Sequence, residues 1–124
     1  MLKIANALLS LLLILCIFMA GISPALAITI EWLEFQVPPG EQAEFIKQDR
    51  LIWDKFLRQY PGFLGKEIWV DRQNKSRLIV LVRWHSYQEW KAIPLSKVQA
   101  VTEQFHQALG KAYPIISAHA FQVN

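Results

Sequence analysis

The stretch "SRLIVLVRW", residues 76–84, decides the fold of this chain. Successive side chains of a β-strand point to opposite faces of the sheet, and this stretch is apolar at nearly every position. One face of the strand carries Leu78, Val80, Val82 and Trp84, and the other carries Ile79 and Leu81. Helices can cover one face of a sheet built around such a strand. The other face needs a second cover, because large exposed apolar patches mark interaction sites.

The flanking sequence predicts three more strands, over residues 28–37, 63–70 and 113–123, where β-branched and aromatic residues are frequent. A long helix is expected between Glu41 and Tyr60, where apolar residues recur at helical spacing. A second long helix is expected to end at Gly110, a typical C-terminal cap. The polar loop 71–75 has the length of a hairpin connection.

The predicted order is therefore βαββαβ, which is typical of the α+β ferredoxin-like fold, with both helices on one face of an antiparallel sheet. Packing the bare faces of two such sheets together gives a dimeric α+β barrel. We therefore expect a homodimer, since a chain this short buries a limited share of its own surface.

The N-terminal segment predicts export. After the basic start at Lys3, an apolar stretch leads to Pro24 and then to "ALA", residues 25–27, as in a secretory signal peptide with cleavage after Ala27. The alternative is an uncleaved membrane anchor, because the apolar stretch approaches the roughly 17–25 residues that span a bilayer. We expect residues 1–27 to be the signal peptide, residues 28–124 to be the mature domain, and the protein to reach the periplasm, a lumen or the extracellular space.

Composition excludes several classes of function. The net charge is +3 and dispersed, which argues against nucleic acid as a partner. The single cysteine, Cys16, lies in the predicted signal, so the mature domain has neither a disulfide nor a thiolate nucleophile. No spacing typical of metal ligands, of a phosphate loop or of a serine nucleophile elbow occurs, and we predict neither metal nor cofactor.

The octapeptide "RWHSYQEW", residues 83–90, concentrates groups that can carry chemistry, yet it is interpreted as a junction between a strand and a helix. Ser86 and Glu89 have the spacing of a capping box, so a short helix is expected from Ser86 that ends by Pro94. Trp84 and Trp90 are expected to pack in the core.

Three motifs, "YPGFLGKEIWV" at residues 60–70, "WHS" at residues 84–86 and Trp90 after it, resemble the antibiotic biosynthesis monooxygenase (ABM) family of dimeric α+β barrels. With "IEWLEF", residues 30–35, and "WKAIP", residues 90–94, the chain resembles more closely a family of small cyanobacterial proteins. The resemblance covers about residues 28–123.

The resemblance implies either cofactor-free oxygenation of polycyclic phenols or haem degradation, although some ABM-like proteins have no known activity. Haem-degrading relatives use a first-strand asparagine and a tryptophan in the second-helix region. Here the first strand offers Glu31 and Glu34, and Ile93 stands at the tryptophan position. We therefore predict that haem is not a substrate.

Histidine titrates near neutral pH and is the natural candidate for a base. His119 alternates with Ser117 and Phe121 in the last strand, and we hypothesise that it faces a ligand space. His85, at the junction between strand and helix, is the second candidate and is either a surface residue or part of the rim of a pocket. His106 lies off the apolar stripe of its helix and is expected to be solvated. The candidate ligand-binding aromatics are Trp32, Trp69 and Trp84.

Two functions are consistent with these observations. The first is a small-molecule oxygenase or a binder of a small aromatic or hydrophobic compound. The second is a non-catalytic dimeric domain for interaction or stress response. A pocket between sheet and helices, large enough for a bicyclic ligand, would favour the first, and a filled core would favour the second.

Overall fold

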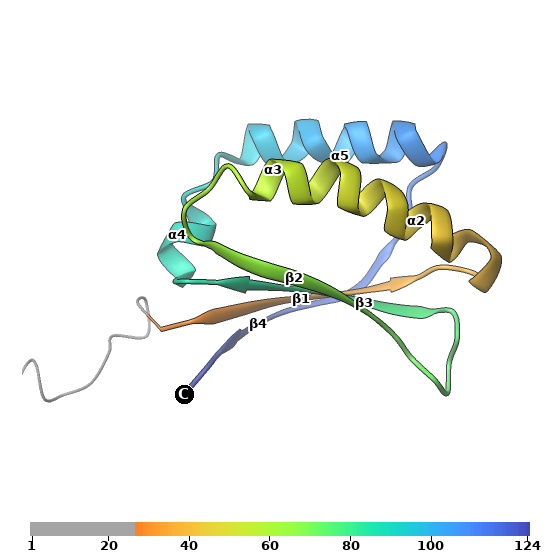
Figure 1. Cartoon of the computed structure of the whole chain (residues 1–124), viewed down its shortest axis with the longest axis horizontal. Helices are drawn as coiled ribbons and strands as arrows, with labels where there is room; N and C mark the ends of the chain where they lie inside the picture. The colour runs from red at the N-terminus through yellow and green to blue at the C-terminus, as the bar shows by residue number, and fades with distance from the viewer. Residues whose placement is uncertain (1–26) are drawn as a thin grey trace, which may run out of the picture.

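The computed structural model describes residues 27–124 (Figure 1). The predicted signal peptide, apart from Ala27, lies outside the described residues. Four strands form one antiparallel sheet in the order β2-β3-β1-β4. The strands are β1 Thr29–Gln36, β2 Phe63–Val70, β3 Arg77–Trp84 and β4 Ile115–Gln122.

All the helices cover the same face of this sheet (Figure 1). The first helical region starts with a 3₁₀ turn and contains a π-helical segment between two α-helical parts. Its parts are η2 Pro39–Glu41, α2 Gln42–Gln48, η3 Asp49–Asp54 and α3 Lys55–Leu57, and the later helices are α4 Tyr87–Lys91 and α5 Leu95–Leu109. The order and the layers confirm the predicted ferredoxin-like fold, which matches that of dimeric α+β barrels.

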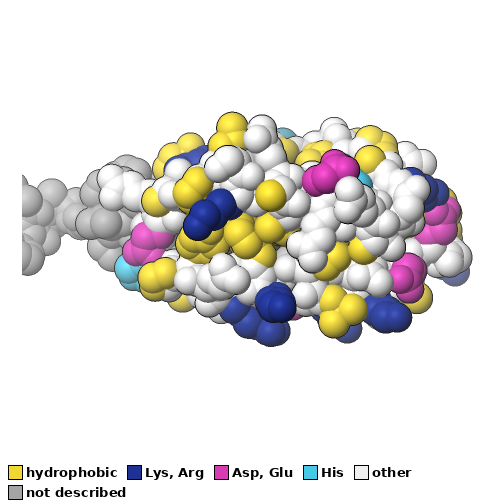
Figure 2. All heavy atoms as spheres, turned by 90° about the horizontal axis from the view of Figure 1, so that it is seen from above, with side chains coloured by type: hydrophobic (Ala, Val, Ile, Leu, Met, Phe, Trp, Pro, Cys, Tyr) yellow, Lys and Arg dark blue, Asp and Glu magenta, His cyan; other side chains and the backbone are white. Residues whose placement is uncertain are grey.

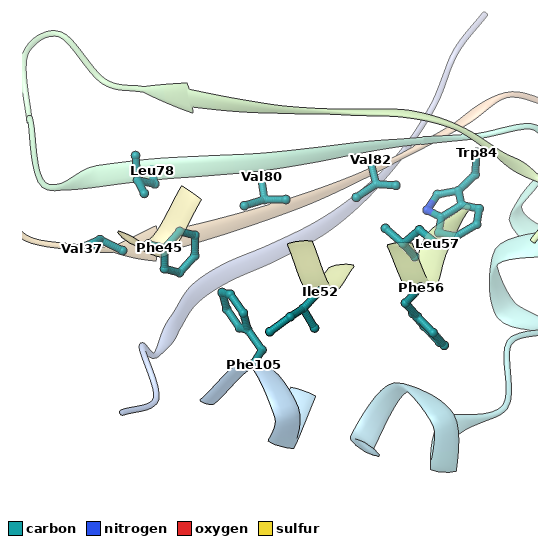
Figure 3. Packing of buried hydrophobic residues seen from close by; sticks show 10 residues of the cluster. All are labelled: Val37, Phe45, Ile52, Phe56, Leu57, Leu78, Val80, Val82, Trp84 and Phe105. Atoms are coloured by element: carbon teal, nitrogen blue, oxygen red, sulfur yellow. The ribbon is translucent and has the colours of Figure 1, made fainter. Parts of the chain in front are cut away.

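The core lies between β3 and the helices, as the alternation along residues 76–84 predicts. Leu78, Val80, Val82 and Trp84 project from β3 toward Phe45, Ile52, Phe56, Leu57 and Phe105 of the helices (Figure 3). Ile79 and Leu81 point to the opposite, helix-free face. Both are nonetheless buried, at 3% and 7% exposure. Apolar packing on both faces of β3 is therefore confirmed.

The junction at residues 83–90 has the predicted structural role. The Ser86 hydroxyl accepts a hydrogen bond of 3.1 Å from the backbone N–H of Glu89, which caps α4. The Trp84 and Trp90 rings stack at an interplanar angle of 10°. Trp84 is 1% exposed, so it belongs to the core as expected.

One irregularity in β2 determines which of its side chains face the helices. Phe63 pairs with Trp84 and Gly65 with Arg83, so Leu64 is an extra residue, as in a β-bulge. Gly65 has φ of 153°, a backbone region that essentially only glycine adopts. Because of the bulge, Lys66 pairs with Val82 and lies on the helix-covered face, the same face as Phe63.

Candidate functional site

A cavity of about 680 Å³ lies between the sheet and the helices. Ligand pockets typically have about 300–1,000 Å³, so this space is large enough for a bicyclic ligand. Its walls are largely aliphatic and aromatic, with contributions from all four strands and from η3, α3, α4 and α5. Seen from the helix side, hydrophobic side chains are visible in the middle of the molecule among polar ones (Figure 2).

Glu31 projects from β1 into this apolar space. The Trp84 indole N–H donates a hydrogen bond of 3.2 Å to Glu31 Oε1. Burial raises the pKa of the Glu31 carboxyl above its ordinary value, while this hydrogen bond and the charge of Lys91 act in the opposite direction. A carboxylate in such a place is a stronger base than one in water, as proton abstraction from an acidic substrate requires.

Lys66 enters the cavity from β2 and is part of a buried group of three charges. Its ammonium donates a hydrogen bond to Asp49 Oδ2, and Asp54 Oδ1 lies 2.5 Å from Nζ without the geometry of a hydrogen bond. The side chains of Lys66 and Asp49 are 4% and 5% exposed. Burial lowers the pKa of the Lys66 ammonium to about 7.

The π-helical segment supplies both carboxylates of this group, Asp49 at its first position and Asp54 at its last. π-Helical segments are rare in proteins overall, and those that do occur are often found at functional sites. Burial raises the pKa of Asp54, against the charges of Arg58 and Arg50. Lys66 also lines a second, polar pocket of about 310 Å³ with Arg50, Asp54 and Glu67.

Glu31 and Lys66 lie in one row across the floor of the cavity. Val82 of β3 pairs with Glu31 on one side and with Lys66 on the other. Neighbouring strands are about 4.8 Å apart, so the backbones of the two charged residues are separated by about 10 Å. The cavity therefore has a carboxyl group at one end of its floor and an amine at the other.

Two other polar side chains of the cavity wall, those of Thr102 and Tyr113, already donate hydrogen bonds within the chain. Thr102 Oγ1 donates to the Val98 carbonyl at 2.8 Å, and the Tyr113 hydroxyl donates to Glu41 at 2.7 Å. His106 lines the cavity and is half-buried, although it was expected to be solvated. It follows the buried Phe105 on α5, so a residue beside the apolar stripe still reaches the wall.

The two histidines that the sequence singled out do not line this cavity. His119 is exposed on the helix-free face of the edge strand β4, where it pairs with Trp32. In a single chain it therefore faces solvent rather than the ligand space. His85 is exposed at the start of the β3–α4 junction, with Nδ1 2.8 Å from Glu89 Oε1.

Of the three candidate tryptophans, only Trp84 lines the cavity. Trp32 and Trp69 lie on the helix-free face, where their rings meet edge to face at a centroid distance of 6.0 Å. Phe121 makes the same kind of contact with Trp32. The structure thus gathers two of the predicted aromatics with Phe121 and His119 in one cluster, on the face opposite the cavity.

Two further properties concern the described residues alone. Within residues 27–124, no three histidine, cysteine, aspartate or glutamate side chains come together in a way that could hold a metal ion. None of the helices in that part of the chain has the length and apolar character that crossing a membrane requires.

The chain matches a known protein family. The sequence profile of the family described as antibiotic biosynthesis monooxygenase matches residues 30–93, which include Glu31, Lys66 and Trp84. No curated protein matches the chain.

Several solved structures have the same fold. One is a monooxygenase from the gene ActVA-Orf6 of Streptomyces coelicolor in complex with nanaomycin D, with 15% identity, a TM-score of 0.62, and coverage of 82% of this chain and 91% of that one. SnoaB, a cofactor-independent oxygenase from Streptomyces nogalater, has 13% identity, a TM-score of 0.55, and coverage of 79% and 94%. A conserved protein from Methanosarcina mazei has 14% identity, a TM-score of 0.58, and coverage of 82% and 97%.

Proposed function

The chain belongs to the antibiotic biosynthesis monooxygenase family, and on this premise we propose that its cavity binds a small aromatic compound and that Glu31 accepts an acidic proton from it. The observation that carries the proposal is a carboxyl group with a raised pKa inside a largely apolar cavity of about 680 Å³. A base of this kind suits a phenolic hydroxyl or an activated ring carbon.

The chemistry that follows deprotonation needs little more from the protein. An electron-rich aromatic anion can give two electrons to dioxygen and form a carbon–oxygen bond with it. After protonation, the hydroperoxide loses water and leaves a carbonyl, so one oxygen atom enters the product, the other leaves as water, and no cofactor has to supply electrons. The oxygenases among the structural relatives support this direction, since one is described as cofactor-independent. Trp84 would hold Glu31 in place through its indole N–H and offer an aromatic wall to the ring.

The test uses 2-naphthol, a fluorescent bicyclic phenol, as the probe. We expect the protein to bind it and Glu31→Gln to weaken binding at pH 7 by about tenfold, because a hydrogen bond to an ionised group becomes one to an amide. Glu67→Gln is the matched control, because Glu67 also accepts a bond from a tryptophan indole but lies on the helix-free face. Equal affinity of wild type and Glu31→Gln would exclude Glu31 as the proton acceptor.

The assembly proposed with this function is a homodimer through the helix-free face. Trp69 and Phe121 are 44% and 49% exposed there, and both contact Trp32. A second copy of the chain can cover this aromatic cluster with the same cluster of its own. Sedimentation that shows a stable monomer at micromolar concentration would contradict the dimer.

The same surface supports a second candidate function, a dimeric interaction domain without catalysis. The size of the cavity argues against it, because a domain of this kind needs no ligand space. Failure of the protein to bind any aromatic probe, together with a stable dimer, would favour this alternative.

Export and a closer relationship to small cyanobacterial proteins complete the proposal. Cleavage after Ala27 would leave every strand intact, because β1 begins at Thr29. N-terminal sequencing of the protein from its native cells should give Ile28. A product that begins at Met1 in the membrane fraction would establish the anchor instead. The cyanobacterial relationship depends on the motifs at residues 30–35 and 90–94.

A further inference from the structure

We propose that Lys66 is a second recognition group of the cavity, and that it selects ligands with a neutral carbonyl-type oxygen at the end opposite the hydroxyl that faces Glu31. This inference rests on the proposed function of the cavity and specifies the class of ligand. Three features of the structure support it: the position of Lys66, its capacity to donate hydrogen bonds, and the charge around it.

The position favours a ligand with polar groups at both ends. Lys66 and Glu31 flank Val82 in one row of the sheet, about 10 Å apart at the backbone. Both line the same cavity, and the floor between them is the apolar side chain of Val82. A flat ring system of two or three rings can lie over Val82 and place one substituent near each charged residue.

The amine has donors to spare. A lysine ammonium carries three N–H groups, and a neutral amine two. In the described part of the chain, two carboxylates contact Lys66 Nζ: Asp49 accepts a hydrogen bond from it, and Asp54 Oδ1 forms an ion pair with it at 2.5 Å. In the ammonium form at least one N–H therefore remains for a ligand oxygen.

The charge decides which oxygen fits. Two carboxylates, Asp49 and Asp54, surround one amine, so the group carries no net positive charge to attract an anion. A carboxylate on the ligand would lie close to two like charges in a poorly solvated place, which is unfavourable. A ketone or quinone oxygen accepts the same hydrogen bond without that cost.

The test compares three fluorescent probes that share a hydroxyl at one end of a naphthalene: 6-acetyl-2-naphthol, 6-ethyl-2-naphthol and 6-hydroxy-2-naphthoate. The acetyl and ethyl groups have similar size, so their ratio of dissociation constants reports the carbonyl alone. With the protein produced from the full-length chain, we expect the acetyl probe to bind about tenfold more tightly than the ethyl probe, as for a hydrogen bond to a charged group. The carboxylate probe should bind most weakly.

The variants separate recognition from folding. Lys66→Met leaves the buried Asp49 without a cation and is at risk of unfolding, so the double variant Asp49→Asn/Lys66→Met, which keeps the net charge, is measured beside it. In the double variant the preference for acetyl over ethyl should fall to about twofold or less. Lys97→Met, at an exposed lysine of α5, should keep the wild-type preference.

The outcomes distinguish this inference from the proposed function. Equal binding of the acetyl and ethyl probes by the wild type, or an unchanged preference in the double variant, would overturn the role of Lys66 and leave the cavity as a ligand site. Tight binding of the carboxylate probe would overturn the selection for a neutral oxygen. If the wild type binds none of the three probes, the proposed function fails and the role of Lys66 fails with it.

Discussion

Each face of the sheet carries a tryptophan whose indole N–H bonds to a glutamate. On the helix-covered face Trp84 donates to Glu31 at 3.2 Å, and on the helix-free face Trp69 donates to Glu67 at 2.8 Å. The chemical groups are the same, but Trp84 is 1% exposed and Trp69 is 44% exposed. The helices therefore make the difference: they remove the first pair from water and enclose a cavity beside it, whereas the second pair remains available to a partner.

The largest difference between the two faces should appear when each tryptophan is truncated. Trp84→Ala should lower the free energy of unfolding by about 4 kcal/mol, because it leaves a large void in the core beside Phe63 and Trp90. Trp69→Ala should cost less than half as much. Urea denaturation of both variants at the same low protein concentration measures this. Equal losses would show that the helix-free face is as well packed as the core.

Loss of an ion pair should likewise cost more stability on the helix-covered face than on the helix-free face. Lys66→Met should destabilise the fold by about 3 kcal/mol, because it leaves Asp49 as a buried charge without a partner. Arg77 bonds to Glu34 on the helix-free face with its side chain 36% exposed, and Arg77→Met should cost clearly less stability than Lys66→Met does. Thermal denaturation of the two variants compares them. A recovery of stability when Asp49→Asn is added to Lys66→Met would assign the loss to the unpaired carboxylate.

A smaller effect is expected on the association of two copies of the chain, and only for substitutions on the helix-free face. Phe121→Ser should weaken the proposed dimer at least about tenfold, as is typical for an aromatic residue at the centre of an interface. Leu51→Ser is the matched control, because Leu51 is 57% exposed but lies in the helical layer. Sedimentation over a range of concentrations gives both dissociation constants. Equal effects of the two substitutions would place the interface elsewhere.

The smallest predicted effect is a gain in the free energy of unfolding rather than a loss. Glu31→Gln should raise stability at pH 7 by about 1 kcal/mol, because it removes a charge from a site that disfavours it. The folded-state pKa of Glu31 lies above the ordinary value of 4.5, so the folded chain holds the proton to higher pH than the unfolded chain does. Wild-type stability is therefore lost as the pH rises through that window, and below about pH 4.5 the substitution should bring no gain. Glu31→Gln and wild type, unfolded by urea at pH 4 and pH 7, check both statements.

The fold could be predicted from sequence because its signals are local or periodic. The strands begin and end close to the predicted residues, and Ser86 caps α4 as the capping box indicates. The two apolar faces of β3 follow from alternation alone. The helix predicted between Glu41 and Tyr60 begins in a 3₁₀ turn, ends at Leu57 and contains the π-helical segment, since apolar spacing does not reveal a local change of helical pitch.

The site could be predicted only in part, because it depends on which face of the sheet a residue occupies. The sequence shows Glu31 and Lys66 as charges among apolar neighbours, but alternation alone cannot tell the face that bears the cavity from the helix-free face. His119 appeared to be a good base on chemical grounds, yet the pairing of β4 with β1 puts it beside Trp32 on the helix-free face. Of the three candidate tryptophans, Trp84 alone lies on the face that bears the cavity, on the strand with the strongest apolar pattern.

The bulge at Leu64 also has a consequence for how this chain is aligned with its relatives. Phe63 and Lys66 are an odd number of positions apart and still face the same way, so the strand absorbs one inserted residue between two segments that each alternate normally. An ungapped alignment to a relative with a regular strand would be out of frame on one side of Leu64, and would equate Lys66 with a residue of the opposite face. A single gap placed at Leu64 restores the frame, and only then can a lysine at this position be recognised as shared or absent among relatives.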